Sequence, residues 1–186
     1  HTSYVLGCAF SPNGRRIITA DLDNKARVWG AETGECQLII GEHTHDVKCC
    51  CFSHDSKYIL TSSWDHTARI WKATDGTLMN TLRHEAGVDS CAFSSNDKLI
   101  VTACDNTVRI WDTQRGQLER TLRGHTDIVI NSCFSADGNR IISVSCDRTA
   151  RIWDAQSGNV LSEFFFFFKF NPYGAFSCDF TPHSFS

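Results

Sequence analysis

A histidine, a hydroxyl side chain, an aspartate and a tryptophan recur together four times along this chain of 186 residues. Serine, histidine and aspartate are the side chains of an acyl-transfer triad. A triad is needed once per active site, whereas this set recurs in every unit and always with a tryptophan, so we interpret it as framework and expect no catalytic residues. The four sets are His1, Thr19, Asp23 and Trp29; His43, Thr61, Asp65 and Trp71; His84, Thr102, Asp105 and Trp111; and His125, Ser143, Asp147 and Trp153.

The ten cysteines are the other residues whose chemistry needs an explanation. The triplet at 49–51 has no metal-ligand spacing, and the sequence contains no C-x-x-C. Most of the others precede a phenylalanine in an apolar run, where a free cysteine behaves as a small hydrophobic residue. We therefore expect reduced, structural thiols in a reducing compartment, with no metal and no cofactor. The cysteines that lie one or two residues before a phenylalanine are Cys8, Cys50, Cys91, Cys133 and Cys178.

The elements that position these residues follow from the repeat itself. The four tryptophans are 42, 40 and 42 residues apart, and a glycine follows each of them by five residues. In the last complete unit the runs 129–134, 140–145, 149–153 and 160–164 predict four strands, separated by a turn at 136–139, a hairpin at 146–148 and a loop at 154–159. No segment has a sustained helical period. Each unit therefore predicts a four-stranded antiparallel meander of about 42 residues, the period of a propeller blade.

The chain resembles the WD-repeat β-propeller family over residues 1–164. The residues that carry the resemblance are GHTDIV at 124–129, the FS-x-DG turn and CDRTARIWD at 146–154, supported by registered copies in the other units. The resemblance implies an all-β fold of four-stranded antiparallel blades. It also implies that each recurrent set forms a buried hydrogen-bond chain, from Trp to Ser or Thr to His to Asp, which joins the inner and outer strands of its blade. Such a chain would satisfy a buried aspartate and an indole N–H.

The expected units are blade 1 at 1–40, blade 2 at 41–83, blade 3 at 84–123 and blade 4 at 124–164. The segment 165–186 is Phe-rich, and it contains a sequence like the first strand of a fifth unit, with Asn171 and Phe180 in the positions of the His and Phe of the other units. Four blades do not close the usual seven-blade ring, which would need about 290 residues. We therefore expect an incomplete or open propeller: a fragment or truncated product, a half-ring that pairs with a second copy through its open blade edges, or a compact four-blade ring. Exposed, the run at 164–168 would promote aggregation.

The third unit departs from the pattern. Thr102 lies three residues before Asp105, whereas the other units have four. A one-residue slip in a strand reverses the facing of its side chains, so we expect a broken network in blade 3. A further recurrent residue, an arginine two positions before each tryptophan, is expected to pack its stem along the blade and keep its charged head in water. These arginines are Arg27, Arg69, Arg109 and Arg151.

The family geometry implies a top face around the central channel. It is formed by the third and fifth residues after each His and by the residue before each hairpin Asp. Exposed aromatic and aliphatic groups beside carboxylates are typical of a peptide-binding surface with an acidic side. The alternative is that these apolar side chains pack under neighbouring loops. The expected partner-binding residues are Tyr4, Leu6, Leu22, Asp46, Lys48, Trp64, Asp89, Ile128, Ile130 and Cys146; the same rule adds Gly87 and Cys104, and Gly174 and Phe176 in the fifth unit.

The function that we expect is a non-catalytic scaffold for proteins or peptides, in the cytoplasm or the nucleus. The alternative is a substrate receptor of a ubiquitin ligase, but some family members that do this carry Arg two residues after the W-D pair, and Arg115 lies three residues after Asp112. The formal charge of −3 and the scattered basic residues argue against nucleic-acid and membrane-surface partners. No apolar run reaches the roughly 20 residues of a membrane helix, and the first ten residues do not resemble a signal peptide.

Overall fold

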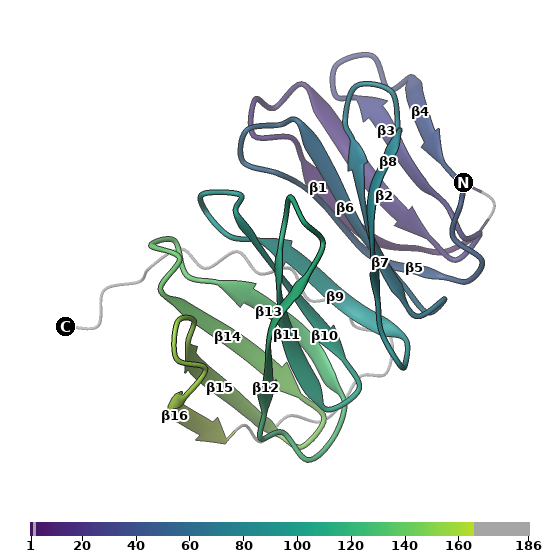
Figure 1. The fold of residues 1–186 in the computed structure, drawn as a ribbon. Coiled ribbons are helices and arrows are strands. Elements are labelled where there is room, and N and C mark those ends of the chain that lie inside the picture. Colours follow the sequence, from purple (N-terminus) through teal and green to yellow (C-terminus); the bar gives the residue numbers. More distant parts are fainter. Residues whose placement is uncertain (2, 166–186) are drawn as a thin grey trace.

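The computed structural model describes residues 1 and 3–165, and every regular element in this part of the chain is a β-strand. The predicted all-β fold is confirmed: the strands form four separate antiparallel sheets of four strands each, and each sheet is built from consecutive strands. The sheets follow one another as an open arc, with blade 1 at one end and blade 4 at the other (Figure 1). The predicted incomplete propeller is therefore confirmed as well.

Strand β1 to strand β4 form blade 1, β5 to β8 blade 2, β9 to β12 blade 3 and β13 to β16 blade 4. The strands are β1 (Val5–Phe10), β2 (Arg16–Asp21), β3 (Ala26–Gly30), β4 (Cys36–Ile40), β5 (Val47–Phe52), β6 (Tyr58–Ser63), β7 (Thr67–Lys72), β8 (Leu78–Arg83), β9 (Val88–Phe93), β10 (Leu99–Cys104), β11 (Thr107–Asp112), β12 (Leu118–Arg123), β13 (Val129–Phe134), β14 (Arg140–Ser145), β15 (Thr149–Asp154) and β16 (Val160–Phe165).

The turn between the first two strands of each blade is set by a serine and an acidic or amide side chain. In blade 2 the Ser53 hydroxyl accepts a hydrogen bond from the backbone N–H of Tyr58 at 2.9 Å and donates to the Asp55 carboxylate at 2.7 Å. The same serine-based closure occurs in the corresponding turns of the other three blades. Side-chain hydrogen bonds of this kind replace the strand ladder where the chain reverses.

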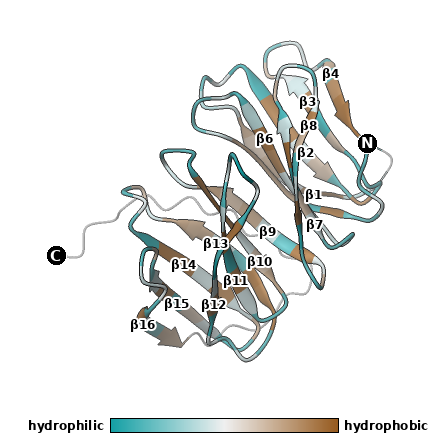
Figure 2. Ribbon diagram, in the orientation of Figure 1, coloured by the Kyte–Doolittle hydropathy of each residue, from teal (hydrophilic) through white to brown (hydrophobic). Residues whose placement is uncertain are grey.

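Blades pack face to face through apolar clusters, one between each neighbouring pair. The inner strands β1, β5, β9 and β13 contact one another in that order. Figure 2 shows why the sequence folds in this way: the apolar residues run along the strands, and the hydrophilic residues gather in the connecting loops. Because alternate residues of a strand point to opposite faces, each blade contributes one apolar side to the blade before it and one to the blade after it.

The missing residue of the third unit lies in the hairpin turn and not in a strand. In blade 3 Cys104 pairs with Thr107, which leaves a two-residue turn, whereas in blade 2 Ser63 pairs with Thr67 across three residues. Thr102 therefore still pairs with Arg109, as Thr61 pairs with Arg69. The expected reversal of side-chain facing is wrong, because a shorter turn leaves the strand register unchanged. Asp105 adopts the left-handed conformation that such a tight turn requires, with a φ of 52°.

The predicted first strand of a fifth unit, with Asn171, Gly174, Phe176 and Phe180, lies outside the described residues, as does most of the phenylalanine run at 164–168. Nothing helical in the described part of the chain could serve as a transmembrane span. The nine cysteines that the structure describes are free thiols.

Candidate protein-interaction surface

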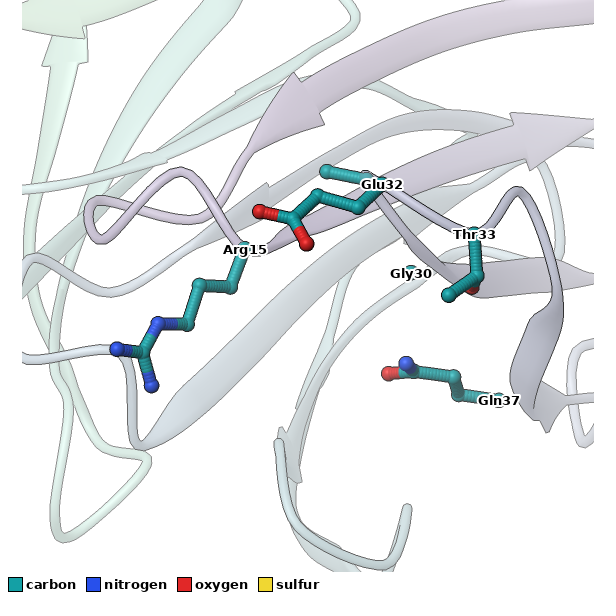
Figure 3. Close-up of a pocket in the computed structure, with 6 residues that line it drawn as sticks. Arg15, Gly30, Glu32, Thr33 and Gln37 are labelled. Atoms are coloured by element: carbon teal, nitrogen blue, oxygen red, sulfur yellow. The ribbon is translucent and has the colours of Figure 1, made fainter.

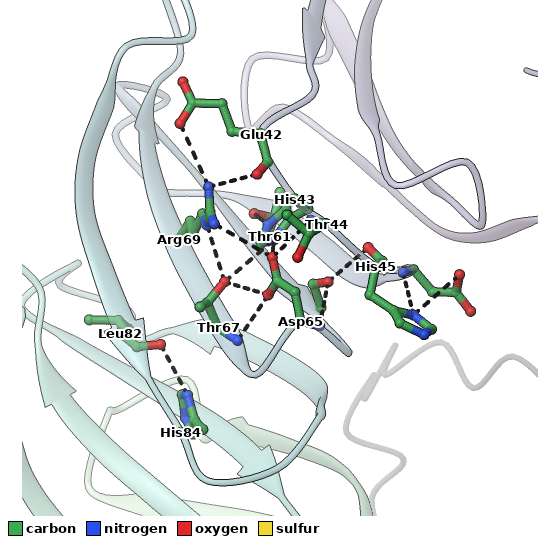
Figure 4. Close-up of polar contacts among 12 residues, drawn as sticks. Glu42, His43, Thr44, His45, Thr61, Asp65, Thr67, Arg69, Leu82 and His84 are labelled. Carbon is green, nitrogen blue, oxygen red and sulfur yellow. Dashed lines mark hydrogen bonds and ion pairs between the residues drawn. The ribbon is translucent and has the colours of Figure 1, made fainter.

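Blade 2 joins its recurrent residues in one hydrogen-bond chain. The Trp71 indole N–H donates to the Thr61 hydroxyl at 2.9 Å, and that hydroxyl lies 2.7 Å from His43 Nε2. His43 Nδ1 lies 2.7 Å from the Asp65 carboxylate (Figure 4). Since a carboxylate only accepts, the proton of the neutral imidazole is on Nδ1, and the chain runs from Trp to Thr to His to Asp. It links β7, β6 and the segment before β5.

The surroundings of His43 and Asp65 set the protonation states of these two residues in the hydrogen-bond chain. Burial lowers the pKa of His43, against the opposing effect of the neighbouring Asp65 carboxylate. Burial alone would raise the pKa of Asp65, but hydrogen bonds from Thr67 and His43 lower it below its usual value. Neutral imidazole beside an ionised carboxylate is therefore the resting state at neutral pH.

Blade 4 repeats the arrangement. Trp153 donates to the Ser143 hydroxyl at 2.8 Å, Ser143 lies 2.7 Å from His125 Nε2, and His125 Nδ1 lies 2.7 Å from Asp147. The Asp147 carboxylate also accepts from the hydroxyl and N–H of Thr149. Burial would raise the pKa of Asp147, but the hydrogen bonds from Thr149 and His125 hold it far below its ordinary value.

Blade 1 uses a different aspartate from the one predicted. His1 Nδ1 lies 2.6 Å from Asp21, whose side chain is fully buried, while Asp23 pairs with the Arg27 guanidinium. Thr19 still lies between His1 Nε2 and the Trp29 indole, at 2.9 Å from each. The predicted contact of Asp23 with His1 is therefore wrong, because Asp21 makes it.

Two sequence differences explain this exchange. Asp21 stands where blades 2 and 4 have Ser63 and Ser145, and its longer carboxylate reaches the imidazole. Lys25 stands where those blades have Thr67 and Thr149, the threonines that hold the hairpin aspartate. The threonine that holds the hairpin aspartate in blades 2 and 4 is thus replaced by Lys25 in blade 1.

Blade 3 keeps part of the chain and loses the aspartate. Trp111 donates to Thr102 at 2.9 Å, and Thr102 lies 2.9 Å from His84 Nε2. His84 Nδ1 donates to the Leu82 carbonyl at 3.1 Å (Figure 4). Asp105 is exposed in the shortened turn. Burial, together with the nearby Arg109 charge, lowers the pKa of His84 to about 4. The network of blade 3 is therefore broken between His84 and Asp105, as expected, but the cause is the shorter turn and not a reversed strand.

The geometry of these sets does not suit nucleophilic catalysis. The hydroxyls of Thr61, Thr102 and Ser143 are completely buried and are engaged by both an indole N–H and an imidazole. A nucleophile must be reachable by the substrate. The sets therefore act as internal braces, and no cluster of three or more His, Cys, Asp or Glu residues within 1 and 3–165 is arranged to hold a metal ion.

The recurrent arginines are less exposed than the sequence led us to expect. Their side chains retain only 9 to 15% of their accessible surface, and each pairs with a carboxylate. Their charged heads therefore lie in ion pairs at the blade edge and not in water. The pairs are Arg27 with Asp23, Arg69 with Asp65 and Glu42, Arg109 with Glu85, and Arg151 with Glu163.

Of the predicted top-face residues, three come together at the junction of blades 2 and 3. The Trp64 indole N–H donates to Asp89 at 3.0 Å, and the Lys48 ammonium lies 4.2 Å from the centre of the Trp64 ring. Trp64 is still 43% exposed. Burial raises the pKa of Asp89, against the effects of the Trp64 hydrogen bond and the Lys48 charge. An exposed aromatic ring is thus fixed between a cation and a carboxylate.

Gly87 makes this arrangement possible, and sequence reasoning missed its role. A methyl group on Gly87 would lie 2.7 Å from Trp64 Cδ1. In the shortened hairpin of blade 3, Cys104 occupies the buried position of Ser63 and Ser145 and donates to the Ala86 carbonyl. Cys104 therefore does not belong to the top face. The signal in the sequence was the small residue three positions after His84.

The other predicted residues lie in equivalent places on the flanking blades. The Leu22 N–H donates to the Tyr4 carbonyl at 3.0 Å in blade 1, as Cys146 N–H donates to the Ile128 carbonyl at 2.8 Å in blade 4. Tyr4 and Ile128 are exposed, while Leu6, Leu22, Ile130 and Cys146 are half-buried. Asp46 accepts the Trp64 backbone N–H through its carbonyl, and its side chain is half-buried.

One hollow of about 370 Å³ lies elsewhere, beside the β3–β4 loop of blade 1 (Figure 3). It is lined by short loop backbone and by polar side chains such as Arg15, Glu32 and Gln37. It contains none of the predicted site residues. A binding pocket is usually apolar with a few converging polar groups, and this hollow lacks that character.

Two family models match the chain. One, described as "WD domain, G-beta repeat", matches residues 1–30 and 34–72, and the other, described as "NWD2 C-terminal beta-propeller", matches residues 78–165. Both agree with the four sheets. The chain belongs to the WD-repeat β-propeller family. No curated protein matches it.

Membership gives this propeller a general role. WD-repeat propellers generally act as protein-interaction scaffolds, and the family is typically non-catalytic. A fold alone does not identify a partner, because binding depends on particular side chains. Among the described residues, the Trp64, Lys48 and Asp89 cluster combines an exposed aromatic ring with a cation and a carboxylate.

Proposed function

We propose that the propeller is a non-catalytic scaffold that binds a peptide segment of another protein on its top face, centred on Trp64. The observation that carries the proposal is the Trp64 ring, 43% exposed yet fixed by Asp89 and Lys48. Fixed, partly exposed tryptophans dominate the energetics of protein interfaces, because they bury a large apolar area and lose little conformational freedom on binding.

The surroundings of Trp64 support a segment with an apolar side chain next to a basic one. Tyr4 and Ile128 supply further exposed apolar surface on the neighbouring blades. Asp89 supplies a carboxylate at the Trp64 indole, and Asp46 lies next to Trp64 through a backbone hydrogen bond. The free thiols of the described residues fit the proposed location in the cytoplasm or nucleus.

The experiment is an affinity capture from cell extract with three immobilised forms of the chain: wild type, Trp64→Ala and Met79→Ala. Met79 is as exposed as Trp64, at 43%, but lies on the outer strand β8. We expect Trp64→Ala to lose the captured protein and Met79→Ala to retain it. Retention by a folded Trp64→Ala variant would reject this surface.

A further inference from the structure

The face of the Trp64 ring already holds a cation, and that cation belongs to the chain itself. The Lys48 ammonium lies 4.2 Å from the ring centre, while the ring remains partly exposed. A cation over a tryptophan face is attracted by the negative charge density of the ring, but at an exposed site this attraction is weak. Lys48 therefore covers the ring face without closing it to another cation.

Asp89 is the second part of the arrangement. Its Oδ1 accepts the Trp64 indole N–H at 3.0 Å, which holds the carboxylate at the edge of the ring. Among the described residues, Oδ2 of Asp89 accepts no hydrogen bond, and Lys48 forms no ion pair with Asp89. The carboxylate is thus fixed in position while half of its acceptor capacity is unused.

The position of Asp89 makes a direct cationic partner favourable. Asp89 is half-buried, and burial raises its pKa, while the Trp64 hydrogen bond and the Lys48 charge offset this effect only in part. A cation in contact with a partly buried carboxylate stabilises its ionised form. A ligand that brings such a cation to Oδ2 would supply what Lys48 does not.

The next blade adds negative charge on the same side. Burial raises the pKa of the Cys146 thiol of blade 4, and the Asp127 and Asp89 carboxylates raise it further. The two carboxylates therefore act on one region of the top face, on the blade 4 side of Trp64. This field favours a cation at Asp89 over an anion.

Within residues 1 and 3–165, the ring, the cation and the carboxylate come together at the junction of blades 2 and 3. Each of these two blades packs against a described blade on both of its sides, so this junction is complete in the described part of the chain. Blades 1 and 4 carry aliphatic residues or cysteine at the equivalent positions: Leu6 and Ile130 in place of Lys48, and Leu22 and Cys146 in place of Trp64.

We propose that the top face recognises an arginine side chain of the bound segment, and that Lys48 occupies the place of this arginine in the free protein. The arginine guanidinium displaces Lys48, stacks on the Trp64 ring and donates to Oδ2 of Asp89. A guanidinium suits both contacts, because it is planar, stacks on aromatic faces and donates from its edge to carboxylates. Lys48 repels a second cation, so it is replaced by a side chain that gains the Asp89 contact. The inference rests on the proposed function above.

NMR titration of the full chain with capped tripeptides tests the inference. The observed signal is the Trp64 indole N–H, assigned by its loss in Trp64→Phe. The probes have a glycine at each end and differ in the central residue: arginine, the uncharged citrulline of the same length, or glutamate. We expect the arginine peptide to bind at least about threefold more tightly than the other two. Equal binding of the citrulline peptide, or tighter binding of the glutamate peptide, would overturn the proposal.

Two variants test the roles of Lys48 and Asp89. Lys48→Ala removes the competing cation and should tighten binding of the arginine peptide at least about threefold. Asp89→Asn keeps an oxygen for the indole N–H but removes the charge, and it should weaken that binding by a similar factor. Lys72→Ala is the matched control, because Lys72 is an exposed lysine at the end of β7 in the same blade; it should bind as wild type does. Weaker binding by Lys48→Ala, or unchanged binding by a folded Asp89→Asn variant, would overturn the proposal.

A failure of the top-face proposal gives a different result from a failure of this inference. Retention of the captured protein by a folded Trp64→Ala variant rejects the whole surface, whichever tripeptide binds. Loss of the captured protein in Trp64→Ala, together with equal binding of the arginine and citrulline peptides, retains the surface and overturns only the recognition of arginine.

Discussion

At the scale of single residues, the hydroxyl in each recurrent set decides how the set is interpreted. Ser143 and Thr61 are fully buried, and each receives an indole N–H on one side and faces an imidazole nitrogen on the other. A buried polar group with both partners satisfied is stabilising, and removal of one partner leaves the other unsatisfied. We therefore interpret these residues as groups that stabilise the fold and not as nucleophiles.

Asp147→Asn tests this at the best-formed set. The change removes the charge that accepts hydrogen bonds from His125 and Thr149, so we expect the free energy of unfolding to fall by about 1–3 kcal/mol. Chemical denaturation measures it. Asp105→Asn is the matched control, because Asp105 is exposed and does not contact its histidine; it should change the stability by less than about 0.5 kcal/mol. Equal losses in the two variants would contradict the assignment.

His84 makes stability depend on pH in a defined window. Its pKa in the folded chain is about 4, below the ordinary 6.5, so the folded state binds the proton less readily than the unfolded state does. The contribution of neutral His84 is therefore complete above pH 6.5 and is lost as the pH falls toward 4, by up to about 1.4 kcal/mol per pH unit. Urea unfolding between pH 7 and 4 should show a shallower fall for His84→Gln than for wild type. The same slope of unfolding free energy against pH in both proteins would count against this role of His84.

At the scale of elements, the hairpin between the second and third strands decides which aspartate, if any, contacts the histidine of each blade. The repeat pattern predicted the strands and the turns, and the resemblance to the WD-repeat family implied the buried hydrogen bonds between the strands. The pattern did not predict that Asp21 would replace Asp23, since that depends on a threonine that holds the aspartate from the next strand. The sequence placed the missing residue of blade 3 at the strand-to-hairpin turn, but it did not show that the two-residue turn leaves the strand register unchanged.

The turn length of blade 3 can be restored. Inserting one serine between Cys104 and Asp105 gives a three-residue turn like that of blade 4 and should bring Asp105 to His84 Nδ1. A nearby carboxylate favours the charged imidazole, so we expect the pKa of His84 to rise above about 4. NMR titration of the His84 ring protons measures it. A pKa that does not move would show that turn length alone does not control the network.

The Trp64 cluster depends on a neighbouring element as well. Gly87→Ala introduces a methyl group against the Trp64 ring and should displace it from Asp89, while the strands remain intact. We expect weaker partner capture with a melting temperature within about 3 °C of wild type. Partner capture equal to wild type would indicate that the Trp64–Asp89 geometry is not part of the site. The sequence could not give this contact, because its partners come from different blades.

At the scale of the whole molecule, the described blades form an open arc, with the proposed Trp64 surface on the top face and exposed apolar residues on blades 1 and 4. The sequence predicted the number of blades, and the structure adds which apolar residues are left uncovered. Exposed apolar faces of this kind mark interaction sites or aggregation hazards. The proposed top-face site and the exposed apolar residues of blades 1 and 4 are formed by different side chains, so each can be changed separately.

The central claim is that partners bind at Trp64, and site-specific photo-crosslinking tests it most directly. A photoreactive phenylalanine analogue is placed at position 64 and, as the control, at position 75, which is exposed in the β7–β8 loop of the same blade. After irradiation in cell extract we expect a discrete covalent adduct from position 64 and none from position 75. Adducts of equal yield from both positions, or from position 75 alone, would contradict the account.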